Sequence, residues 1–527
     1  ELGTGIEIAG ENDALGLGYY GKSLLKSEQL VEKLKRPTWD RIFRIKDALM
    51  AGVSVKHIHQ LTYIDRWFLH QIQDIVNLEK QLLEYDLQSV PVDMLKDAKK
   101  MGFSDAQLSV LFGDCEEDEV YAKRKELGIR RTFKMVDTCS AEFEAKTPYF
   151  YSTFDTENES KVTDKKKIIV LGSGPNRIGQ GIEFDYCCTH GLQAIQDCGY
   201  EAIMVNCNPE TVSTDFDMAD KLYFEPVFWE NLREIIDLEK PEGVIVQLGG
   251  QTALKLAKRL EANSIKIIGT SFDNMDIAED RGRFSDMLKE LEIPYPKYGT
   301  AYNTDDAIEV AKEVGYPVLV RPSYVLGGQR MRIVINEEEL EESVLSLLRH
   351  LPGNKILIDH FLDRCQEAEI DGIFDGTDFH VMGVMEHIEP AGIHSGDSHA
   401  LLPAFNLSPI EVTTMEYYAE KIARALNIRG LINIQFAIKD GNVFVIEANP
   451  RASRTTPFIA KAYQIPYLNI ATKVMIGAKK LKDFTIEKKL TGFAIKEPVF
   501  SFNKFPGVNK ELGPEMKSTG EAIRFIK

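Results

Sequence analysis

The chain has 527 residues, which predicts three or four domains at roughly 150 residues each, and 44% of its residues are apolar, enough to bury several cores. Its 63 Lys and Arg are outnumbered by 81 Asp and Glu, giving a formal net charge of −18. This balance argues against nucleic acid or an anionic membrane as the main partner, because both bind clustered basic residues. Neither a membrane-spanning apolar run nor a signal peptide pattern is present, so we expect a cytoplasmic protein. The first residue is not Met, which leads us to expect a fragment or a processed chain.

Cysteines and histidines give no sign of a disulfide framework or a metal site. Cys187 and Cys188 are adjacent, and the other five cysteines are scattered without a C-x-x-C spacing. We therefore expect reduced thiols, as in cytosolic proteins. His57, His59 and His70 lie in the N-terminal third, but no further His or Cys completes a ligand spacing, so packing or surface roles are expected.

Residues 27–150 are predicted to be helical and to lack strands. Apolar residues at steps of four and three mark one helix of about five turns; they are Ile64, Phe68, Ile72, Ile75, Leu78 and Leu82. Ile42, Ile45 and Leu49 indicate a preceding helix, and Ser104 is a candidate N-cap for a later one.

The chain then changes to alternating strands and helices. Residues 152–167 contain only two apolar side chains, which is a linker composition. Strands are predicted at Ile168–Leu171, Ala202–Asn206, Gly243–Gln247 and Lys266–Ile268, with a helix running to about Asp197 after the first. This order predicts a parallel sheet with helices on its faces.

From about Asp280 the pattern is that of an α+β domain. Its predicted elements are strands at Pro317–Arg321, Lys355–Asp359, Ala368–Ile373 and His380–Met385, a helix at Glu411–Leu426 and a hairpin at Leu431–Ala448. The fold class is therefore α/β multidomain. We expect a helical domain with an N-terminal connecting segment at 1–150, a linker at 151–167, a Rossmann-like domain at 168–280, an α+β domain at 281–500 and a C-terminal connecting segment at 501–527.

A glycine-rich turn, Gly172–Gly181, follows the first strand of the parallel sheet. Glycines at this place let the backbone approach an anionic ligand, but they equally suit a tight turn packed against a neighbouring domain, and both interpretations stay open. The third glycine comes too late for G-x-G-x-x-G, and the second strand ends in Asn206 rather than an acidic residue. NAD binding is therefore not expected.

The final hairpin carries the most informative polar pattern. Glu447, Asn449 and Arg451 are spaced by two, so they share one face of a strand. A three-residue loop at Asp440–Asn442 would place Gln435 opposite Glu447, whereas a two-residue turn would send Gln435 to the other face. We adopt the three-residue loop.

This pairing predicts a nucleotide and metal site. Gln435, Glu447 and Asn449 would supply oxygen ligands of the kind that Mg²⁺ prefers when nucleotide phosphates also hold it. Arg451 and Arg454 could clamp a phosphoryl group or a small anion, whereas the alternative is a hairpin of solvated polar residues. Two further segments suit such a site: the loop after Arg321 that contains Gly327-Gly328, and the turn around His394. No Walker A motif occurs, so an ATP site must be of another type.

Motifs along most of the chain resemble the large chain of carbamoyl phosphate synthetase. They are GSGPNRIGQGIEFDYCCTH, VNCNPETVSTDFD, EKPEGVIVQLGGQT, VRPSYVLGG, MEHIEPAGIHSGDS and IEANPRASRT, with LTYIDRWFLHQI and KMVDTCSAEFEA in the helical block. The resemblance covers about residues 30–525. It implies an oligomerisation domain followed by the pre-ATP-grasp and ATP-grasp domains of the second synthetase half, without the first half or the regulatory domain.

The resemblance also implies an activity, ligands and partners. The activity is phosphorylation of carbamate by ATP, for arginine and pyrimidine biosynthesis, with two Mg²⁺ (or Mn²⁺) ions. Nucleotide contacts would come from Arg321, His360, Leu362, Glu367, Gly392, Ile393, His394, Ser395, Gln435 and Glu447. Gln435, Glu447 and Asn449 would hold the metals, and Arg321, Arg451 and Arg454 would act on the transferred group. Partners would be the first synthetase half, a glutaminase small subunit and further copies in a homo-oligomer.

Two alternatives remain at this point. One is a catalytically silent fragment that acts as an oligomerisation or assembly module. The other is a different ATP-grasp ligase, such as a biotin-dependent carboxylase component, which the motifs VNCNPETVSTDFD and GIHSGDS disfavour.

Overall fold

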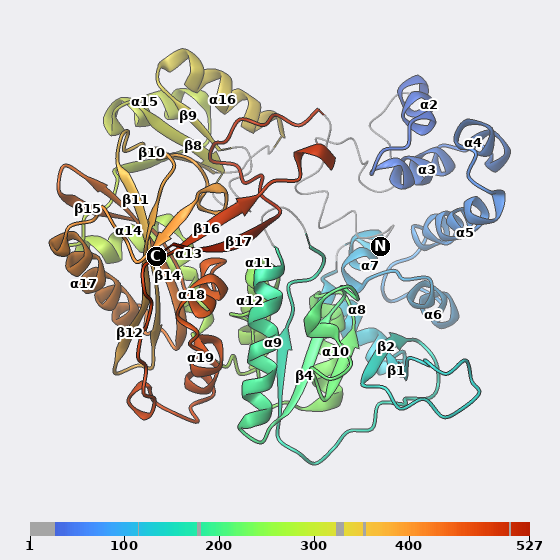
Figure 1. Cartoon of the computed structure of the whole chain (residues 1–527). Coiled ribbons are helices and arrows are strands. Elements are labelled where there is room, and N and C mark those ends of the chain that lie inside the picture. The colour runs from blue at the N-terminus through green and yellow to red at the C-terminus, as the bar shows by residue number, and fades with distance from the viewer. Residues whose placement is uncertain are drawn as a thin grey trace. The chain divides into compact units, whose positions relative to one another are not determined.

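A computed structural model of the chain describes residues 27–113, 115–176, 181–322, 331–350, 355–504 and 507–526 (Figure 1). The chain divides into two compact units, which are described separately below. The first comprises the chain up to Lys134 with Ser152–Glu159 and Ser346–Gly353, and the second comprises Met135–Tyr151, Ser160–Leu345 and Asn354–Lys527. Within the described residues, every helix is too short or too polar to cross a lipid bilayer.

The first unit is built from short helices. They are α2 (Ser27–Lys35), α3 (Arg41–Met50), α4 (Val55–Thr62), α5 (Arg66–Leu82), α6 (Val92–Lys100), α7 (Asp105–Phe112) and α8 (Glu117–Glu126). Ser104 caps α7 as predicted, because its Oγ accepts the main-chain N–H of Gln107 at 3.0 Å. The Ser104 side chain thus binds one of the main-chain N–H groups that have no partner within the first turn of the helix.

Helix α5 buries Leu78 and Leu82 of the predicted stripe, together with Leu69 and Val76, which do not belong to it. Phe68 is 58% exposed, whereas Leu69 is fully buried. Leu69 and Val76 pack in a core with residues of α3 and α4, and Leu82 packs in a second core with residues of α6 and α7. One helix therefore serves two cores, and a single periodic stripe does not describe its buried face.

Two short strands, β1 (Thr132–Met135) and β2 (Tyr149–Thr153), correct the prediction that residues 27–150 lack strands. Both contain half-buried positions and only four or five residues, too few to show an alternating pattern. In the second unit, Tyr149 and Phe150 of β2 pair in parallel with β5 (Lys221–Phe224). The predicted linker, residues 151–167, overlaps the end of β2. It also contains Ser160, whose Oγ lies 2.8 Å from the Tyr223 hydroxyl.

The second unit begins with the predicted parallel sheet, in the order β2-β5-β4-β3-β6. Its further elements are β3 (Lys167–Leu171), α9 (Ile182–Asp197), β4 (Glu201–Asn206), η3 (Val212–Thr214), α10 (Trp229–Glu239), β6 (Gly243–Ile245), α11 (Gly250–Leu254) and α12 (Ala257–Ala262). The predicted strand Lys266–Ile268 is wrong, because only a single parallel bridge joins Ile267 to Val244. Strand β5 was not predicted.

The remainder of the second unit contains two antiparallel sheets. The four-stranded sheet, in the order β7-β10-β8-β9, uses β7 (Tyr298–Ala301), β8 (Val318–Pro322), β9 (Arg332–Val334) and β10 (Ile356–His360). The seven-stranded sheet, in the order β15-β14-β11-β12-β13-β16-β17, uses β11 (Gln366–Phe374), β12 (Phe379–His387), β13 (Ala400–Leu402), β14 (Gly430–Lys439), β15 (Asn442–Asn449), β16 (Phe493–Val499) and β17 (Gly520–Ile526).

Helices and 3₁₀ turns complete this region. They are α13 (Phe272–Glu279), α14 (Arg281–Glu290), α15 (Thr304–Val314), α16 (Glu337–His350), η4 (Ser395–Asp397), α17 (Pro409–Ala425), α18 (Thr455–Tyr463), α19 (Tyr467–Ile476), η5 (Leu481–Asp483) and η6 (Phe502–Lys504). The strands and the helix predicted after Asp280 all occur, with ends displaced by up to two residues.

The turn of the final hairpin differs from the prediction. Lys439 pairs with Asn442, so the loop has two residues, Asp440 and Gly441, and not three. Their φ angles are 51° and 77°. Both central residues of a type I′ turn have positive φ, and the Asp-Gly sequence is typical of it.

A β-bulge restores the predicted pairing despite the shorter turn. Phe436 pairs with Val445, but the next pair is Gln435 with Glu447, so Ile446 is an extra residue in β15. Arg281 of α14 donates through Nη1 to the main-chain oxygen of Ile446 at 2.9 Å. The bulge therefore places Glu447 opposite Gln435.

Candidate functional site

Two rows of polar side chains cross the strands β11, β14 and β15. Residues opposite one another in antiparallel strands project from the same face. The first row is Glu369, Gln435 and Glu447, and the second is Asp371, Asn433 and Asn449. Three carboxylates and three amides thus share one face of the sheet.

The predicted metal-binding residues lie together at the β15 end of these rows. Asn449 donates to Glu447 Oε1 at 3.0 Å, and Arg451 Nη2 donates to Asn449 Oδ1 at 3.0 Å. Gln435 Nε2 lies 3.4 Å from the Oγ of Ser395, on the loop between β12 and β13. The structure therefore brings Ser395, Gln435, Glu447, Asn449 and Arg451 into one connected cluster.

The chemistry of this cluster suits a divalent cation that a nucleotide also holds. Its side-chain ligands would all be oxygens, of which one carboxylate, Glu447, carries charge. In the part of the chain that the structure describes, no group of three or more His, Cys, Asp and Glu side chains is placed to bind a metal. Mg²⁺ commonly binds through one or two carboxylates together with substrate phosphates. The residues present therefore fit a nucleotide-bound Mg²⁺ better than an ion held by protein alone.

Two arginines border the cluster in a desolvated setting. Burial lowers the pKa of both Arg451 and Arg454, although both remain cationic near neutral pH. The Arg451 guanidinium lies over the ring of Phe184 at 5.7 Å from its centroid, and its Nε has no hydrogen-bond partner among the described residues. A buried cationic donor without a partner is suited to an anionic ligand.

Arg454 lies against the loop that contains Gly396. A Cβ added to Gly396 would lie 3.1 Å from Arg454 Nη1. Gly396 N–H donates to His394 Nδ1 at 3.0 Å. Burial, with the nearby Arg454 charge, lowers the pKa of His394 to about 3, so the ring is neutral and its Nδ1 accepts.

The same loop is fixed to β11 and β16. Gly392, at φ +92°, donates its N–H to Glu367 Oε1 at 3.1 Å. The main-chain oxygen of Ser395 accepts from Lys496 Nζ at 2.8 Å. Ile393 lies between these two anchors and is half-buried. Predicted nucleotide residues on two segments, Glu367 and Gly392–Ser395, are thus in direct contact.

Arg321 reaches the cluster through a buried ion triad. Asp359 Oδ2 accepts from Arg321 Nε at 3.1 Å, and Asp359 Oδ1 forms an ion pair with Arg281 Nη2 at 2.8 Å. Burial alone would raise the pKa of Asp359, but the two arginines lower it overall. Because Arg281 also binds the Ile446 carbonyl, Arg321 is linked to the bulge that precedes Glu447.

The remaining predicted nucleotide residues, His360 and Leu362, lie at and just beyond the end of β10. His360 Nδ1 lies 2.8 Å from the main-chain oxygen of Gly315, so its ring is engaged by the loop before β8. Leu362 is half-buried in the connection to β11.

Several buried polar residues at the site were not predicted. Burial would lower the pKa of His387, but contacts with Glu367 and Glu369 raise it to about 9. Asp371 is also buried, and burial together with the Glu369 charge raises its pKa to about 6. The sequence could have indicated Glu369 and Asp371. With Glu367 they occupy every second position of one strand, so the three side chains share a face.

The glycine-rich turn after β3 packs closely against the end of β4. Gly174 donates its N–H to Asn206 Oδ1 at 3.1 Å, and a Cβ on Gly172 would lie 2.5 Å from Asn206 Cγ. The segment from Arg177 to Gln180 of this turn lies outside the described residues, as does the predicted closing loop with Gly327-Gly328.

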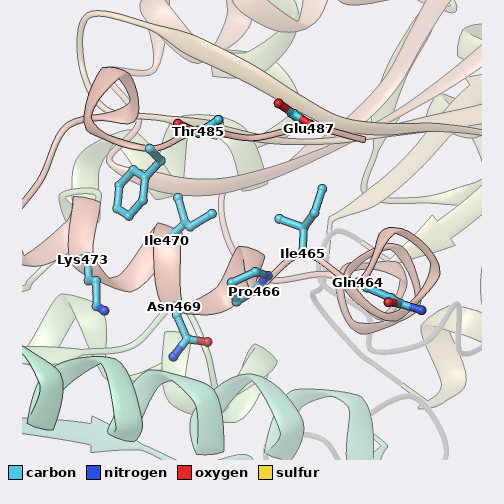
Figure 2. Close-up of a pocket in the computed structure, with 9 residues that line it drawn as sticks. Gln464, Ile465, Pro466, Asn469, Ile470, Lys473, Thr485 and Glu487 are labelled. Atoms are coloured by element: carbon cyan, nitrogen blue, oxygen red, sulfur yellow. The ribbon is translucent and has the colours of Figure 1, made fainter. Parts of the chain in front are cut away.

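A separate surface pocket of about 420 Å³ lies near the connection between α18 and α19 (Figure 2). It is lined by Gln464, Ile465, Pro466, Asn469, Ile470, Lys473, Phe484, Thr485 and Glu487. None of the predicted site residues belongs to this lining.

Comparisons with known families match three domain models to successive parts of the chain. Residues 9–128 match the carbamoyl-phosphate synthetase large chain oligomerisation domain, residues 164–277 match the carbamoyl phosphate synthase preATP-grasp domain, and residues 280–483 match the carbamoyl-phosphate synthase L chain ATP binding domain. Together these matches cover most of the chain.

Two curated relatives are carbamoyl phosphate synthase large chains from archaea. The relative from Archaeoglobus fulgidus is 52% identical over 96% of this chain, and that from Methanothermobacter thermautotrophicus is 50% identical over 93%. The matched regions are 48% and 46% of those relatives. The chain therefore spans about half the length of the curated relatives it matches.

Solved structures with a similar fold include a biotin carboxylase domain and a ribonucleotide synthetase. The biotin carboxylase domain of Hydrogenobacter thermophilus 2-oxoglutarate carboxylase, in complex with Mg-ADP, ADP and bicarbonate, is 20% identical, with a TM-score of 0.52 over 68% of this chain and 86% of that one. N5-carboxyaminoimidazole ribonucleotide synthetase from Thermus thermophilus is 17% identical, with a TM-score of 0.51 over 68% and 93%. At these identities the likeness shows the fold alone, and it confirms the predicted α/β multidomain class.

Proposed function

Because the chain belongs to the carbamoyl phosphate synthase large-chain family, we propose that its second unit transfers the γ-phosphoryl group of ATP to carbamate. The products are carbamoyl phosphate and ADP. This is the second phosphorylation of carbamoyl phosphate synthesis, which serves arginine and pyrimidine biosynthesis. The synthetase motifs throughout the chain support this substrate over the carboxylations named for its structural neighbours.

The observation that carries the proposal is the connected cluster from Ser395 to Arg451. It combines a carboxylate, two amides and a partly desolvated guanidinium on one sheet edge. A nucleoside triphosphate needs these groups together, because oxygen ligands hold its metal and a cation neutralises the charge of the transferred phosphoryl group.

In the proposed reaction, an oxygen of carbamate attacks the γ-phosphorus of ATP. The bond between that phosphorus and the oxygen bridging to the β-phosphate breaks, and ADP leaves with the electron pair. Arg451 and Arg454 bind the charge on the γ-phosphoryl group and on carbamate, and Arg321 binds the nucleotide phosphates. This positioning and charge neutralisation account for the catalysis, and no covalent enzyme intermediate is required.

Gln435, Glu447 and Asn449 would hold two Mg²⁺ ions, or Mn²⁺, when the nucleotide is bound. The ions would neutralise phosphate charge and orient the γ-phosphoryl group. The nucleotide itself would contact the residues named for it above, from Arg321 to Glu447. Carbamate decomposes in water, so the closed site must also exclude solvent.

Carbamate supply and assembly belong to the same proposal. We propose that a first synthetase half forms carbamate, that a glutaminase small subunit supplies ammonia, and that the helical unit joins copies into a homo-oligomer. The acidic composition and the seven cysteines, which are scattered without a C-x-x-C spacing, are consistent with a cytoplasmic location.

The reverse reaction tests the proposal without carbamate supply. The protein would be given carbamoyl phosphate and Mg-ADP, and ATP would be measured by coupled luminescence. We expect ATP formation by the wild type and none by Glu447→Ala with an unchanged circular dichroism spectrum. A wild type that binds Mg-ADP but forms no ATP would contradict the proposal.

A second candidate, the assembly module, is favoured by exposed aromatic residues in the first unit. Tyr63 is 87% exposed, and Trp67 and Phe68 form an exposed edge-to-face pair with ring centroids 5.0 Å apart. Exposed apolar clusters of this kind often mark protein interfaces. Light scattering of the wild type and of Trp67→Ser with Phe68→Ser would test it, and an identical mass for both would count against an interface there.

A further inference from the structure

A buried carboxylate lies beneath the segment that carries the two arginines. Asp371 lies on β11 where the pairing with β12 shifts register, and it is 1% exposed. Its Oδ1 accepts from the hydroxyls of Ser453 and of Thr456, the latter at 3.1 Å. Its Oδ2 accepts from the Thr455 hydroxyl at 2.8 Å and from Asn433 Nδ2 at 3.2 Å. One carboxylate therefore binds three hydroxyls from a stretch of four consecutive residues.

The same hydroxyls shape the beginning of α18. Ser453 Oγ accepts the main-chain N–H of Thr456 at 3.0 Å, and the N–H of Ser453 donates to Thr456 Oγ1 at 3.1 Å. The negative charge of Asp371 thus lies at the N-terminus of a nine-residue helix, where the helix dipole favours it. The carboxylate and the helix start stabilise each other.

The bound segment includes both arginines proposed to meet the transferred group. Arg454 lies between Ser453 and Thr455, and Arg451 is two residues before Ser453. Among the described residues, no ion pair joins Asp371 to either arginine, and the hydrogen bonds named above join its carboxylate to the three hydroxyls and to Asn433. Asp371 can therefore fix the backbone of the segment without engaging either guanidinium group.

A second anchor holds the segment from the parallel-sheet side. Gln247, which is fully buried, donates through Nε2 to the main-chain oxygen of Pro450 at 2.6 Å. Its own main-chain oxygen accepts from Ala452 N–H at 2.9 Å. Gln247 thus brackets Arg451 on both sides, and Asp371 holds the residues that follow.

We infer that Asp371 is a positioning residue for phosphoryl transfer, holding the Pro450–Thr456 segment through Ser453, Thr455 and Thr456 so that Arg451 and Arg454 face the transferred group. The inference rests on the proposed function for the part played by the arginines, but the anchoring of the segment does not. A displacement of about 1 Å in a group that contacts the transition state can cost roughly 100-fold in rate. Nucleotide contacts on β8, β11 and the β12–β13 loop are not held by Asp371.

The test compares Asp371→Asn with Asp375→Asn. Asp375 is a matched control, because it is 2% exposed and accepts main-chain N–H groups of Thr377, Asp378 and Leu481, all outside the arginine segment. We expect Asp371→Asn to lower the rate of ATP formation from carbamoyl phosphate and Mg-ADP by about 10- to 100-fold, with the Kd for Mg-ADP changed less than twofold. Asp375→Asn should keep the wild-type rate.

A second readout is independent of activity. Hydrogen exchange of peptides that cover residues 450–456 should be at least about tenfold faster in Asp371→Asn than in the wild type or in Asp375→Asn. Wild-type exchange in Asp371→Asn would overturn the inference, as would an unchanged rate of ATP formation. If the wild type forms no ATP but the exchange still differs, the proposed function fails while the anchoring role stands.

If Asp371→Asn does not fold, Thr456 provides the test. Thr456→Val removes the hydroxyl and Thr456→Ser retains it. We expect a slower reaction and faster exchange at 450–456 for Thr456→Val, with rescue of both by Thr456→Ser. Equal behaviour of the two variants would overturn the inference.

Discussion

The ion triad around Asp359 provides a prediction whose size follows from the structure. Asp359→Asn keeps the shape of the side chain but removes the charge that Arg281 and Arg321 share at 2.8 and 3.1 Å. A hydrogen bond to a charged group contributes about 1.5–3 kcal/mol, and Arg321 is 22% exposed, which reduces its share through solvent screening. We therefore expect a loss of about 3 kcal/mol from the stability of the second unit.

Calorimetry and nucleotide binding measure this effect. For a unit of this size, about 3 kcal/mol corresponds to a fall in Tm of roughly 5 °C. The Kd for Mg-ADP should rise about tenfold, because Arg321 and the bulge before Glu447 both lose their common support. Because the two arginines lower the pKa of Asp359, its stabilising contribution is present above about pH 4 and is lost as the pH falls further.

The control variant is Asp363→Asn. Its carboxylate is 58% exposed and lies 3.5 Å from the exposed Arg364, so we expect a change in Tm of less than about 1 °C. A Tm for Asp359→Asn equal to that of the wild type, with unchanged affinity for Mg-ADP, would refute the reasoning about the triad.

Three further predictions concern the same site. Glu447→Gln should abolish ATP formation without lowering Tm, because the side chain is exposed and its charge serves the metal; retained turnover would contradict this assignment. Gly396→Ala should slow the reaction about tenfold in steady-state assays, because the added Cβ lies 3.1 Å from Arg454 Nη1 and would displace this guanidinium. An unchanged rate would show that Arg454 can move aside without loss of activity. The neighbouring carboxylates raise the pKa of His387 to about 9 despite its burial, so its contribution to stability, on the order of 3 kcal/mol, is complete below about pH 6.5 and is lost as the pH rises through 9. Urea unfolding of His387→Gln between pH 6 and 9.5 should show the difference from wild type shrinking, and a constant difference would count against a charged His387.

Strands β3, β4 and β6 of the parallel sheet could be predicted because their interiors are continuous apolar runs, whereas β7, β9, β13, β16 and β17 were not predicted. Strand β5 was not predicted because Lys221 begins it and the segment before it is polar, yet Lys221 is buried and bonded to Glu239 at 2.7 Å. A buried ion pair is a tertiary feature that periodicity does not reveal. The strand at Lys266–Ile268 was wrong for the opposite reason, because its apolar residues form only one bridge.

In the hairpin, the predicted pairing of Gln435 with Glu447 is confirmed although the predicted turn length is wrong. Asp440-Gly441 is a strong two-residue turn signal, and taken alone it puts Gln435 on the other face from Glu447. The bulge at Ile446 reverses that outcome, and the bulge carbonyl is bound by Arg281, 165 residues earlier in the chain. No local pattern in the hairpin predicts that contact.

The polar rows could be predicted in part from the sequence, but the hydrogen bonds of Asp371 to the arginine segment could not. The spacing of Glu447, Asn449 and Arg451 predicted a shared face, and these residues do form one cluster. The role of Asp371 depends on hydroxyls 82 to 85 residues away, so it required the structure.

The most direct test of the central claim is the forward reaction with freshly dissolved ammonium carbamate and Mg-ATP. ADP and carbamoyl phosphate would be quantified together, the latter after trapping with hydroxylamine. We expect carbamate-dependent release of ADP with an equal amount of carbamoyl phosphate, and loss of both in Glu447→Ala. ADP release that does not depend on carbamate, or that yields no carbamoyl phosphate, would contradict the claim.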